Sequence, residues 1–207
     1  MASYGHWPPC LGCCCRYGYK KKCDRRCMRI RLCRIGSSVS EDFRFVEALL
    51  VMAFPREERR EMADLCSVVD SSPAFHCCLI CDDDVAVGLI TYWELEAFCF
   101  VEHFAILPEL RGRGYGSAVM EYMREVMRCP IVLEAEHPVT EMARRRIAFY
   151  ERLGVVRWRH EYWQPPYRVG DGLFPLCLMV WGEMEENEVN FERVRKAIYN
   201  KVYAYDL

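Results

Sequence analysis

Hydrophobic residues recur with two different periods along the chain, and these periods predict where strands and helices lie. Runs that are continuously apolar or that alternate predict strands at residues 28–35, 75–81, 85–93, 98–107, 131–135, 155–161 and 176–181. Helical spacing predicts helices at 118–127, 140–153 and 190–203, and two more between 41 and 69. The first of those two follows the capping residue Ser40, and its expected apolar face consists of Phe45, Leu49, Leu50 and Phe54.

Turn signals between these segments predict how the strands are connected. Residues 71–73, Ser-Ser-Pro, form a turn, and the three aspartates at 82–84 join two strands as a hairpin with an acidic tip. That tip could bind a metal, although a solvated turn is favoured. The strand at 98–107 continues the antiparallel meander, whereas a helical connection makes the strand at 131–135 parallel to it. The order predicts an α/β (α+β) fold with a mixed, mostly antiparallel sheet flanked by helices.

The stretch Pro-Glu-Leu-Arg-Gly-Arg-Gly-Tyr-Gly-Ser at residues 108–117 lies where a buried strand turns directly into a helix. Three glycines in five residues leave backbone N–H groups free to converge, and the positive end of the helix dipole adds to them. Arg111 and Arg113 contribute further positive charge. The stretch lacks the Gly-Lys-Ser/Thr ending of a Walker loop. It predicts a site for a phosphate or pyrophosphate, the alternative being an ordinary glycine-rich turn.

Length, composition and charge narrow the class of protein. A chain of 207 residues, 52% hydrophobic, can bury one sizeable core. A formal net charge of -2 argues against a nucleic-acid binder, and no apolar run reaches the roughly 20 residues that a membrane helix needs. Fourteen cysteines are scattered through apolar positions, which indicates buried free thiols in a reducing, cytoplasmic compartment. The examples are Cys66, Cys77, Cys78, Cys99 and Cys177.

Residues 1–27 differ from the rest because they combine six cysteines with six basic residues against one aspartate. Cys10-x2-Cys13 and Cys23-x3-Cys27 could form a zinc knuckle. A disordered extension, or a natural start at Met28, is favoured over zinc. We therefore expect a cysteine-rich basic extension at 1–27, a single domain at 28–207 and no metal site.

Two motifs in register carry a resemblance to a known family. The pattern Arg111-x-x-Gly114-x-Gly116 after a strand, and Ile-Ala-Phe-Tyr-Glu-Arg-Leu-Gly at 147–154 about 35 residues later, closely resemble the GNAT superfamily of N-acyltransferases. The resemblance covers residues 28–181 and implies a sheet that splays apart between the fourth and fifth strands. Many members have an asparagine before the tyrosine, but here residues 143–146 read Ala-Arg-Arg-Arg. The segment at 162–167 is similar to that of uncharacterised bacterial members.

The resemblance implies acetyl-CoA as co-substrate, with its pantetheine arm between the splayed strands and its pyrophosphate on the glycine loop. The implied cofactor-binding residues are Phe104, Ala105, Ile106, Arg111, Gly112, Arg113, Gly114, Tyr115, Gly116 and Ser117. Arg144, Arg145 and Arg146 either reach the cofactor's 3′-phosphate or form a solvated helix face, which is the favoured interpretation.

Acyl transfer to an amine needs a base for the ammonium, stabilisation of the oxyanion and a proton for the leaving thiolate. Tyr150 resembles the family's proton donor. Strand alternation predicts that Phe100, Glu102 and Phe104 share one face. Glu102 is the expected general base, the alternatives being a substrate-orienting anion or a satisfied buried acid, and Glu94 is the backup base. His103 is expected on the opposite face as a packed histidine. Glu134 and Glu136 are expected to line an acidic pocket.

These expectations combine into a cytoplasmic N-acetyltransferase that transfers acetyl from acetyl-CoA to a primary amine by direct attack in a ternary complex, with no cysteine nucleophile. The acceptor is expected to be a small molecule or a peptide, with neither nucleic acid nor membrane as partner. One alternative is a catalytically weak acyl-CoA-binding or sensing module, and another is a zinc-dependent interaction protein. Exposed aromatic side chains at Tyr162, Trp163 and Tyr167 could form a homodimer contact.

Overall fold

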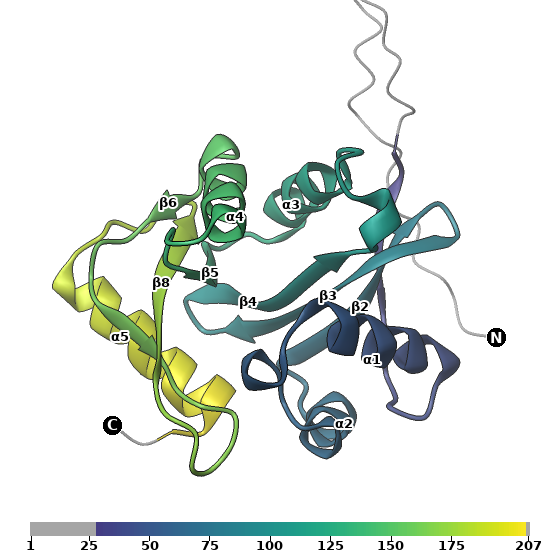
Figure 1. The fold of residues 1–207 in the computed structure, drawn as a ribbon, viewed down its shortest axis with the longest axis horizontal. Coiled ribbons are helices and arrows are strands. Elements are labelled where there is room, and N and C mark those ends of the chain that lie inside the picture. Colours follow the sequence, from purple (N-terminus) through teal and green to yellow (C-terminus); the bar gives the residue numbers. More distant parts are fainter. Residues whose placement is uncertain (1–27, 206–207) are drawn as a thin grey trace, which may run out of the picture.

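The computed structural model describes residues 28–205, which form one sheet with helices on both of its faces (Figure 1). The strands are β1 (Ile30–Arg34), β2 (Phe75–Asp82), β3 (Val85–Leu95), β4 (Phe98–Ile106), β5 (Ile131–Glu136), β6 (Val156–Arg157), β7 (Tyr162–Gln164) and β8 (Phe174–Trp181). The helices are α1 (Glu41–Ala53), α2 (Met62–Ser71), α3 (Tyr115–Val126), α4 (Glu141–Arg152) and α5 (Glu188–Ile198). Short turns of 3-10 helix lie at η1 (Arg56–Glu58) and η2 (Pro108–Leu110), and a π-helical turn, η3 (Tyr199–Tyr203), extends α5.

The strand order is β1-β2-β3-β4-β5-β8-β6, and β7 also pairs with β8. All of these pairs are antiparallel except β4 with β5, which is parallel. The β4–β5 ladder contains only Cys99–Ile131, Phe100–Val132 and Val101–Leu133, after which the two strands separate. The expected mixed sheet, splayed between its fourth and fifth strands, is confirmed.

Each face of the sheet carries its own hydrophobic core. On one face, α1, α2 and α5 pack through residues such as Leu50, Leu65 and Val194. On the other, α3 and α4 pack through residues such as Met120 and Ile147. Figure 1 shows this arrangement, with α3 and α4 above the sheet and the other helices below it. Because both faces are covered, strands such as β2 are buried along nearly their whole length and read as continuous apolar runs.

Helix starts follow the capping signals in the sequence. The Ser40 hydroxyl accepts a hydrogen bond from the Phe43 N–H at 3.2 Å, and Thr140 caps α4 in the same way through the Ala143 N–H. The buried face of α1 differs from the expected one, because Phe43 and Val46 are buried whereas Phe45 and Phe54 are only partly so. Residues 43, 46 and 50 lie on one helical stripe, and that stripe packs on the sheet.

Three of the differences between the observed and the predicted boundaries exceed two residues or divide an element. α3 begins at Tyr115, within the glycine motif, rather than at residue 118. The second helix is divided into η1 and α2, and the expected strand at 155–161 contains only the short β6. In each case, glycine or short polar segments make the end of an element hard to read from periodicity alone.

Within residues 28–205, no helix is long and apolar enough to cross a membrane. Among the same residues, no group of histidine, cysteine and acidic side chains could hold a metal ion. The aspartates at 82–84 therefore do not form such a group. The suggested zinc knuckle and the cysteine-rich extension at 1–27 lie outside the described residues.

Gly88 holds β3 against the part of β4 that borders the splay. A Cβ atom at residue 88 would lie 2.3 Å from the Ala105 carbonyl oxygen, which is backbone and cannot rotate away. We expect Gly88→Ala to lower the free energy of unfolding by about 1–3 kcal/mol, as overpacking does, measured by urea denaturation. Gly36→Ala is the control, because a Cβ there meets nothing within 4 Å. Equal effects of the two substitutions would contradict the proposed collision.

Candidate active site

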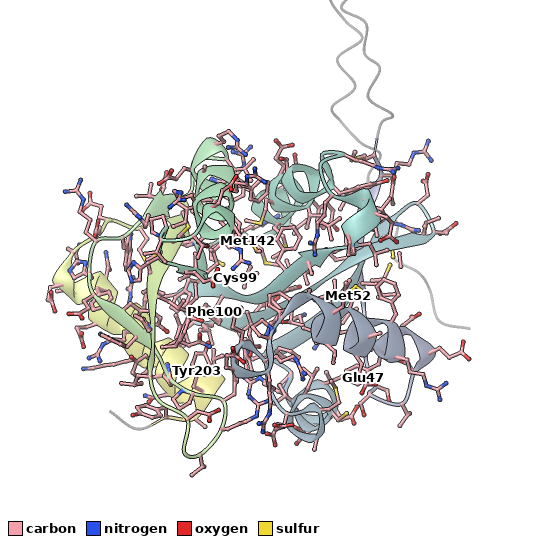
Figure 2. All side chains as sticks on the ribbon, viewed as in Figure 1. Glu47, Met52, Cys99, Phe100, Met142 and Tyr203 are labelled. Atoms are coloured by element: carbon pink, nitrogen blue, oxygen red, sulfur yellow. The ribbon has the colours of Figure 1, made fainter. Side chains whose placement is uncertain are left out.

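The gap between the splayed strands is a cavity of about 710 Å³. One wall is β4 from Val101 to Ile106, and the other is the end of β5 at Leu133 and Glu134. Phe149 and Tyr150 of α4 close one side of the cavity, and Met142 also borders it. Figure 2 labels Met142 at the start of α4. The cavity therefore runs along strand edges that the parallel ladder leaves without a partner strand.

The glycine loop lies at one end of this cavity. Gly112 and Gly114 have φ angles of 75° and 94°, a left-handed region that favours glycine, and Gly114 is the N-cap of α3. The first intrahelical bond runs from the Ala118 N–H to the Gly114 carbonyl, so the N–H groups of Gly116 and Ser117 have no acceptor within the helix. A Cβ on Gly116 would lie 3.2 Å from Phe149, so glycine also allows α3 to approach α4 closely. This geometry suits an anion at the start of α3.

The structure brings together six of the ten residues expected to bind the cofactor. The residues that line the 710 Å³ cavity are Phe104, Ala105, Ile106, Arg111, Gly112 and Gly116. Arg113, Gly114, Tyr115 and Ser117 belong to the same loop and helix start but do not line it. Arg145 and Arg146 do line it, and Arg146 also lies 3.2 Å from Glu136.

A second, smaller cavity of about 60 Å³ adjoins the first. The two cavities share Phe54, Glu102, Glu134 and Arg146. The smaller one is lined in addition by Glu58, His103, Ala135, Glu136, Gln164, Tyr167 and Leu176. Two carboxylates, Glu102 on β4 and Glu134 on β5, therefore lie at the border between the 710 Å³ cavity and the smaller cavity, which is lined by two further glutamates.

A β-bulge in β4 changes which side chains share a face. Tyr92 pairs with Val101 and Thr91 with His103, so Glu102 is an extra residue without a partner on β3. After the bulge the alternation is reversed: His103 contacts Phe54, whereas Phe104 packs in the core beneath α3 and α4. The prediction that Phe104 shares a face with Glu102, and that His103 faces away from it, is therefore wrong.

Glu102 is held as an anion by a dense set of donors. Its side chain is 1% exposed, and its oxygens accept hydrogen bonds from Arg60 Nε, the Trp93 indole N–H and the Tyr167 hydroxyl, each at 2.9 Å. The Arg60 guanidinium also lies over the rings of Trp93 and Tyr167. Burial alone would raise the pKa of Glu102, but Arg60 and the two other donors lower it below its usual value. A carboxylate held in this way is a weak proton acceptor.

Glu134 lies in the opposite electrostatic environment. It accepts hydrogen bonds from the hydroxyls of Tyr162 and Tyr203, the latter at 2.7 Å, and no cation among the described residues pairs with it. Burial raises the pKa of Glu134 to about 7, the two tyrosines oppose that shift, and the charge of Glu102 adds to it. Figure 2 shows Tyr203 on the α5 side of the molecule. Glu134 can therefore take up and release a proton near neutral pH.

Two other titratable groups near the site are Tyr150, which keeps its proton, and His103, whose two ring nitrogens are both hydrogen-bonded within the protein. The Tyr150 side chain lines the large cavity, and burial raises its pKa to about 12, so its hydroxyl keeps its proton. His103 Nε2 donates to the Glu58 carbonyl, its Nδ1 accepts from the Thr91 hydroxyl, and burial lowers its pKa. Cysteines of the described chain line neither cavity.

Two expectations do not match the geometry. Glu94 lies opposite Cys99, at the end of β4 remote from the splay, where it faces His76 at 3.3 Å and lines neither cavity. Tyr162 is 1% exposed and, like Tyr167, binds a site carboxylate, so these two are not exposed contact residues; Trp163, at 39%, is the exposed one. Sequence reasoning missed Arg60 and Tyr203, whose links to β4 and β5 span 42 and 69 residues and leave no local signal.

Comparison with known proteins agrees with this fold. Residues 40–155 match the model of the acetyltransferase (GNAT) family. A protein from Bacteroides thetaiotaomicron assigned to the GNAT acetyltransferases is 43% identical, with a TM-score of 0.82 over 85% of this chain and 99% of its own. YjbC of Bacillus subtilis, assigned as an acetyltransferase, is 22% identical over 73% of this chain and 78% of its own. NAA60 of Arabidopsis thaliana, solved with acetyl-CoA, shares the fold at 16% identity and a TM-score of 0.52, over 73% of this chain and 97% of its own.

A mixed sheet that opens between β4 and β5, with a cavity and a glycine loop at the opening, is the architecture of an acyltransferase. The chain belongs to the GNAT family of acetyltransferases.

Arg60 is the cation that permits a buried charge at residue 102. We expect Arg60→Met to lower the free energy of unfolding at pH 7 by about 3–5 kcal/mol, because it leaves an uncompensated anion. The loss should shrink on acidification. The pKa of Glu102 is lowered in the folded state, so the ion pair stabilises above the unfolded pKa of about 4.3 and is lost as the pH falls through the folded pKa.

Urea denaturation between pH 3 and pH 7 measures this effect. The double variant Arg60→Met/Glu102→Gln should recover most of the stability, because the buried charge is then absent. Arg145→Met is the matched control, since its ion pair with Glu141 is largely exposed, and it should change stability little. If Arg60→Met lowers the free energy of unfolding no more than Arg145→Met does, the role of Arg60 is refuted.

Proposed function

We propose that the protein transfers an acetyl group from acetyl-CoA to a primary amine by direct attack within a ternary complex. One observation carries the proposal. A single cavity connects the glycine loop to Tyr150 and reaches, at Glu102 and Glu134, a second cavity rich in carboxylates. Such a path suits a long cofactor that enters from one side and a cationic acceptor that enters from the other.

The cofactor is proposed to lie along β4. Its pyrophosphate would be bound at the start of α3 by backbone N–H groups, with Arg111 and Arg113 beside them. The amides of its pantetheine arm would pair with backbone groups of residues 104–106, which have no partners on β5. Arg145 and Arg146, which line the cavity, are available to a further phosphate. The residues present therefore fit acetyl-CoA, which would supply the thioester.

Glu134 is proposed as the general base and Glu102 as the anion that orients the ammonium. The ammonium gives a proton to Glu134, and the neutral nitrogen attacks the thioester carbonyl. An N–C bond forms and the C–S bond breaks. This assignment differs from the expectation that Glu102 is the base, because Arg60 and two other donors already stabilise the charge of Glu102. Two carboxylates with shifted pKa values in opposite directions commonly divide such roles.

Tyr150 is proposed to donate the proton that the leaving thiolate needs. Its raised pKa, about 12, keeps the hydroxyl protonated throughout the working pH range. Among residues 28–205 its hydroxyl has no hydrogen-bond partner, and it borders the cavity, so it is available to a ligand there. The nitrogen loses its second proton as the amide forms, and this proton replaces the one that Tyr150 gives to the thiolate. The products are an N-acetylated amine and CoA thiol, and the proton on Glu134 returns to solvent.

Binding of acetyl-CoA is the first test. A ligand that binds only the native state raises the melting temperature, so saturating acetyl-CoA should raise it by several degrees in the wild type. Gly114→Glu should abolish the shift, because a carboxylate would then occupy the loop. Gly170→Glu is a matched control, since residue 170 has a similar φ of 98° but lies outside the cavity, and it should keep the shift. Absence of a shift in the wild type would refute cofactor binding.

The proton donor and the base are tested by rate profiles against pH. We expect kcat/KM of the wild type to rise with an apparent pKa near 7 as Glu134 ionises. Glu134→Gln should remove this rise and lower kcat by about 10²–10³-fold. Tyr150→Phe should lower kcat by about 10–10²-fold without weakening acetyl-CoA binding.

Two outcomes of these assays would favour other conclusions. If both variants bind acetyl-CoA and the wild type acetylates no amine in a broad panel, the protein is a binding or sensing module rather than an enzyme. If Glu102→Gln, and not Glu134→Gln, removes the rise near pH 7, the base is Glu102.

A further inference from the structure

The four carboxylates of the smaller cavity differ in what neutralises them. Glu102 is paired with Arg60 at 2.9 Å and Glu136 with Arg146 at 3.2 Å. Glu134 accepts from tyrosine hydroxyls only. The Glu58 carboxylate has neither a hydrogen bond nor an ion pair with any residue that the structure describes. The cavity therefore contains two carboxylates without a cationic partner, Glu58 and Glu134.

The backbone around Glu58 is fixed, which gives its carboxylate a defined position. Its carbonyl accepts a hydrogen bond from His103 Nε2 at 3.0 Å, and this bond ties the η1 turn to β4. His103 is itself held by Thr91 on β3. Burial and the charge of Glu136 raise the pKa of Glu58, and the charge of Arg146, which forms its ion pair with Glu136 and not with Glu58, opposes that shift only in part. The ammonium group of a ligand beside Glu58 would form the missing ion pair and would lower the pKa of Glu58 again.

The shape of the cavity restricts what can carry such an ammonium. Its volume is about 60 Å³, enough for roughly four waters at about 10–15 Å³ of cavity each, and therefore for a short chain of heavy atoms. Phe54 and His103 form one aromatic edge, with ring centroids 4.8 Å apart, and Tyr167 lies beside His103. Aromatic walls and carboxylates together suit alkylammonium groups. A branched α-carbon bearing a carboxylate would meet both a narrow space and the charges of Glu58 and Glu136.

We propose that Glu58 determines acceptor specificity by binding a second ammonium group, so that the acceptor is an unbranched aliphatic diamine or longer polyamine. This inference rests on the proposed N-acetyltransferase function. One amine is acetylated beside Glu134, and the other stays charged beside Glu58. A lysine side chain offers the same alkylammonium end without the second charge, so it should be the poorer acceptor.

The test compares diaminobutane with butylamine, which has the same chain length and one ammonium fewer, by the release of CoA thiol. We expect wild-type kcat/KM to favour the diamine by about tenfold or more. Glu58→Gln should raise KM for the diamine by about tenfold while leaving kcat and the kinetics of butylamine unchanged. Glu57→Gln is the matched control, because residue 57 is exposed on the same turn and does not line the cavity.

The outcomes separate this inference from the function it rests on. Equal use of the two amines, or a Glu58→Gln effect no greater than that of Glu57→Gln, would overturn the diamine proposal while acetyl transfer stands. Nα-acetyl-lysine methylamide, or a peptide with a free α-amine, used better than the diamine would do the same and would identify a protein substrate. Failure to acetylate any of these amines, with acetyl-CoA binding demonstrated, would overturn the proposed function as well.

Discussion

The short parallel ladder between β4 and β5 is the constraint on which the site depends. Three residue pairs hold the strands together at Cys99–Val101, and beyond them the strands separate. Backbone groups of a buried strand need partners, so an edge opened inside a protein is a place where a ligand can supply them. The bulge at Glu102 lies at the point of separation. The same irregularity that ends the pairing therefore directs a carboxylate into the opening.

Much of this arrangement could be predicted from local patterns. Strand periodicity located β2, β3 and β4, and the three glycines after β4 indicated an anion site at the start of α3 because positive φ angles are a property of glycine itself. Two motifs about 35 residues apart carried the resemblance to the GNAT superfamily, and that resemblance implied the splayed sheet. The strands, the glycine loop and each motif are local signals, contained within a few residues of sequence, where propensity and spacing are informative.

The parts that could not be predicted depend on contacts between distant segments. A bulge inserts one residue without changing composition, so alternation placed His103 and Phe104 on the wrong sides of β4. Arg60 and Tyr203 come from a turn after α1 and from the last helical turn, and neither has a pattern that relates it to a strand. Their effects decide the electrostatics: Arg60 makes Glu102 a fixed anion, and the tyrosines bind Glu134 without neutralising it. Sequence alone could name both carboxylates but not divide their roles.

Family membership accounts for one part of the site, the glycine loop with its cavity, better than for the other part, the tyrosines that bind Glu102 and Glu134. The segment that matches the GNAT family, residues 40–155, contains the glycine loop, Tyr150 and both central carboxylates, to which the proposed acetyl transfer assigns cofactor binding and proton transfer. Tyr162, Tyr167 and Tyr203 lie after it, on β7, the following loop and the turn beyond α5. They donate to Glu134 and Glu102 from the acceptor side. If the proposed acetyl transfer holds, the acceptor would be chosen by these tyrosine-bound carboxylates together with Glu58, and the choice has to be argued from this chain's own side chains.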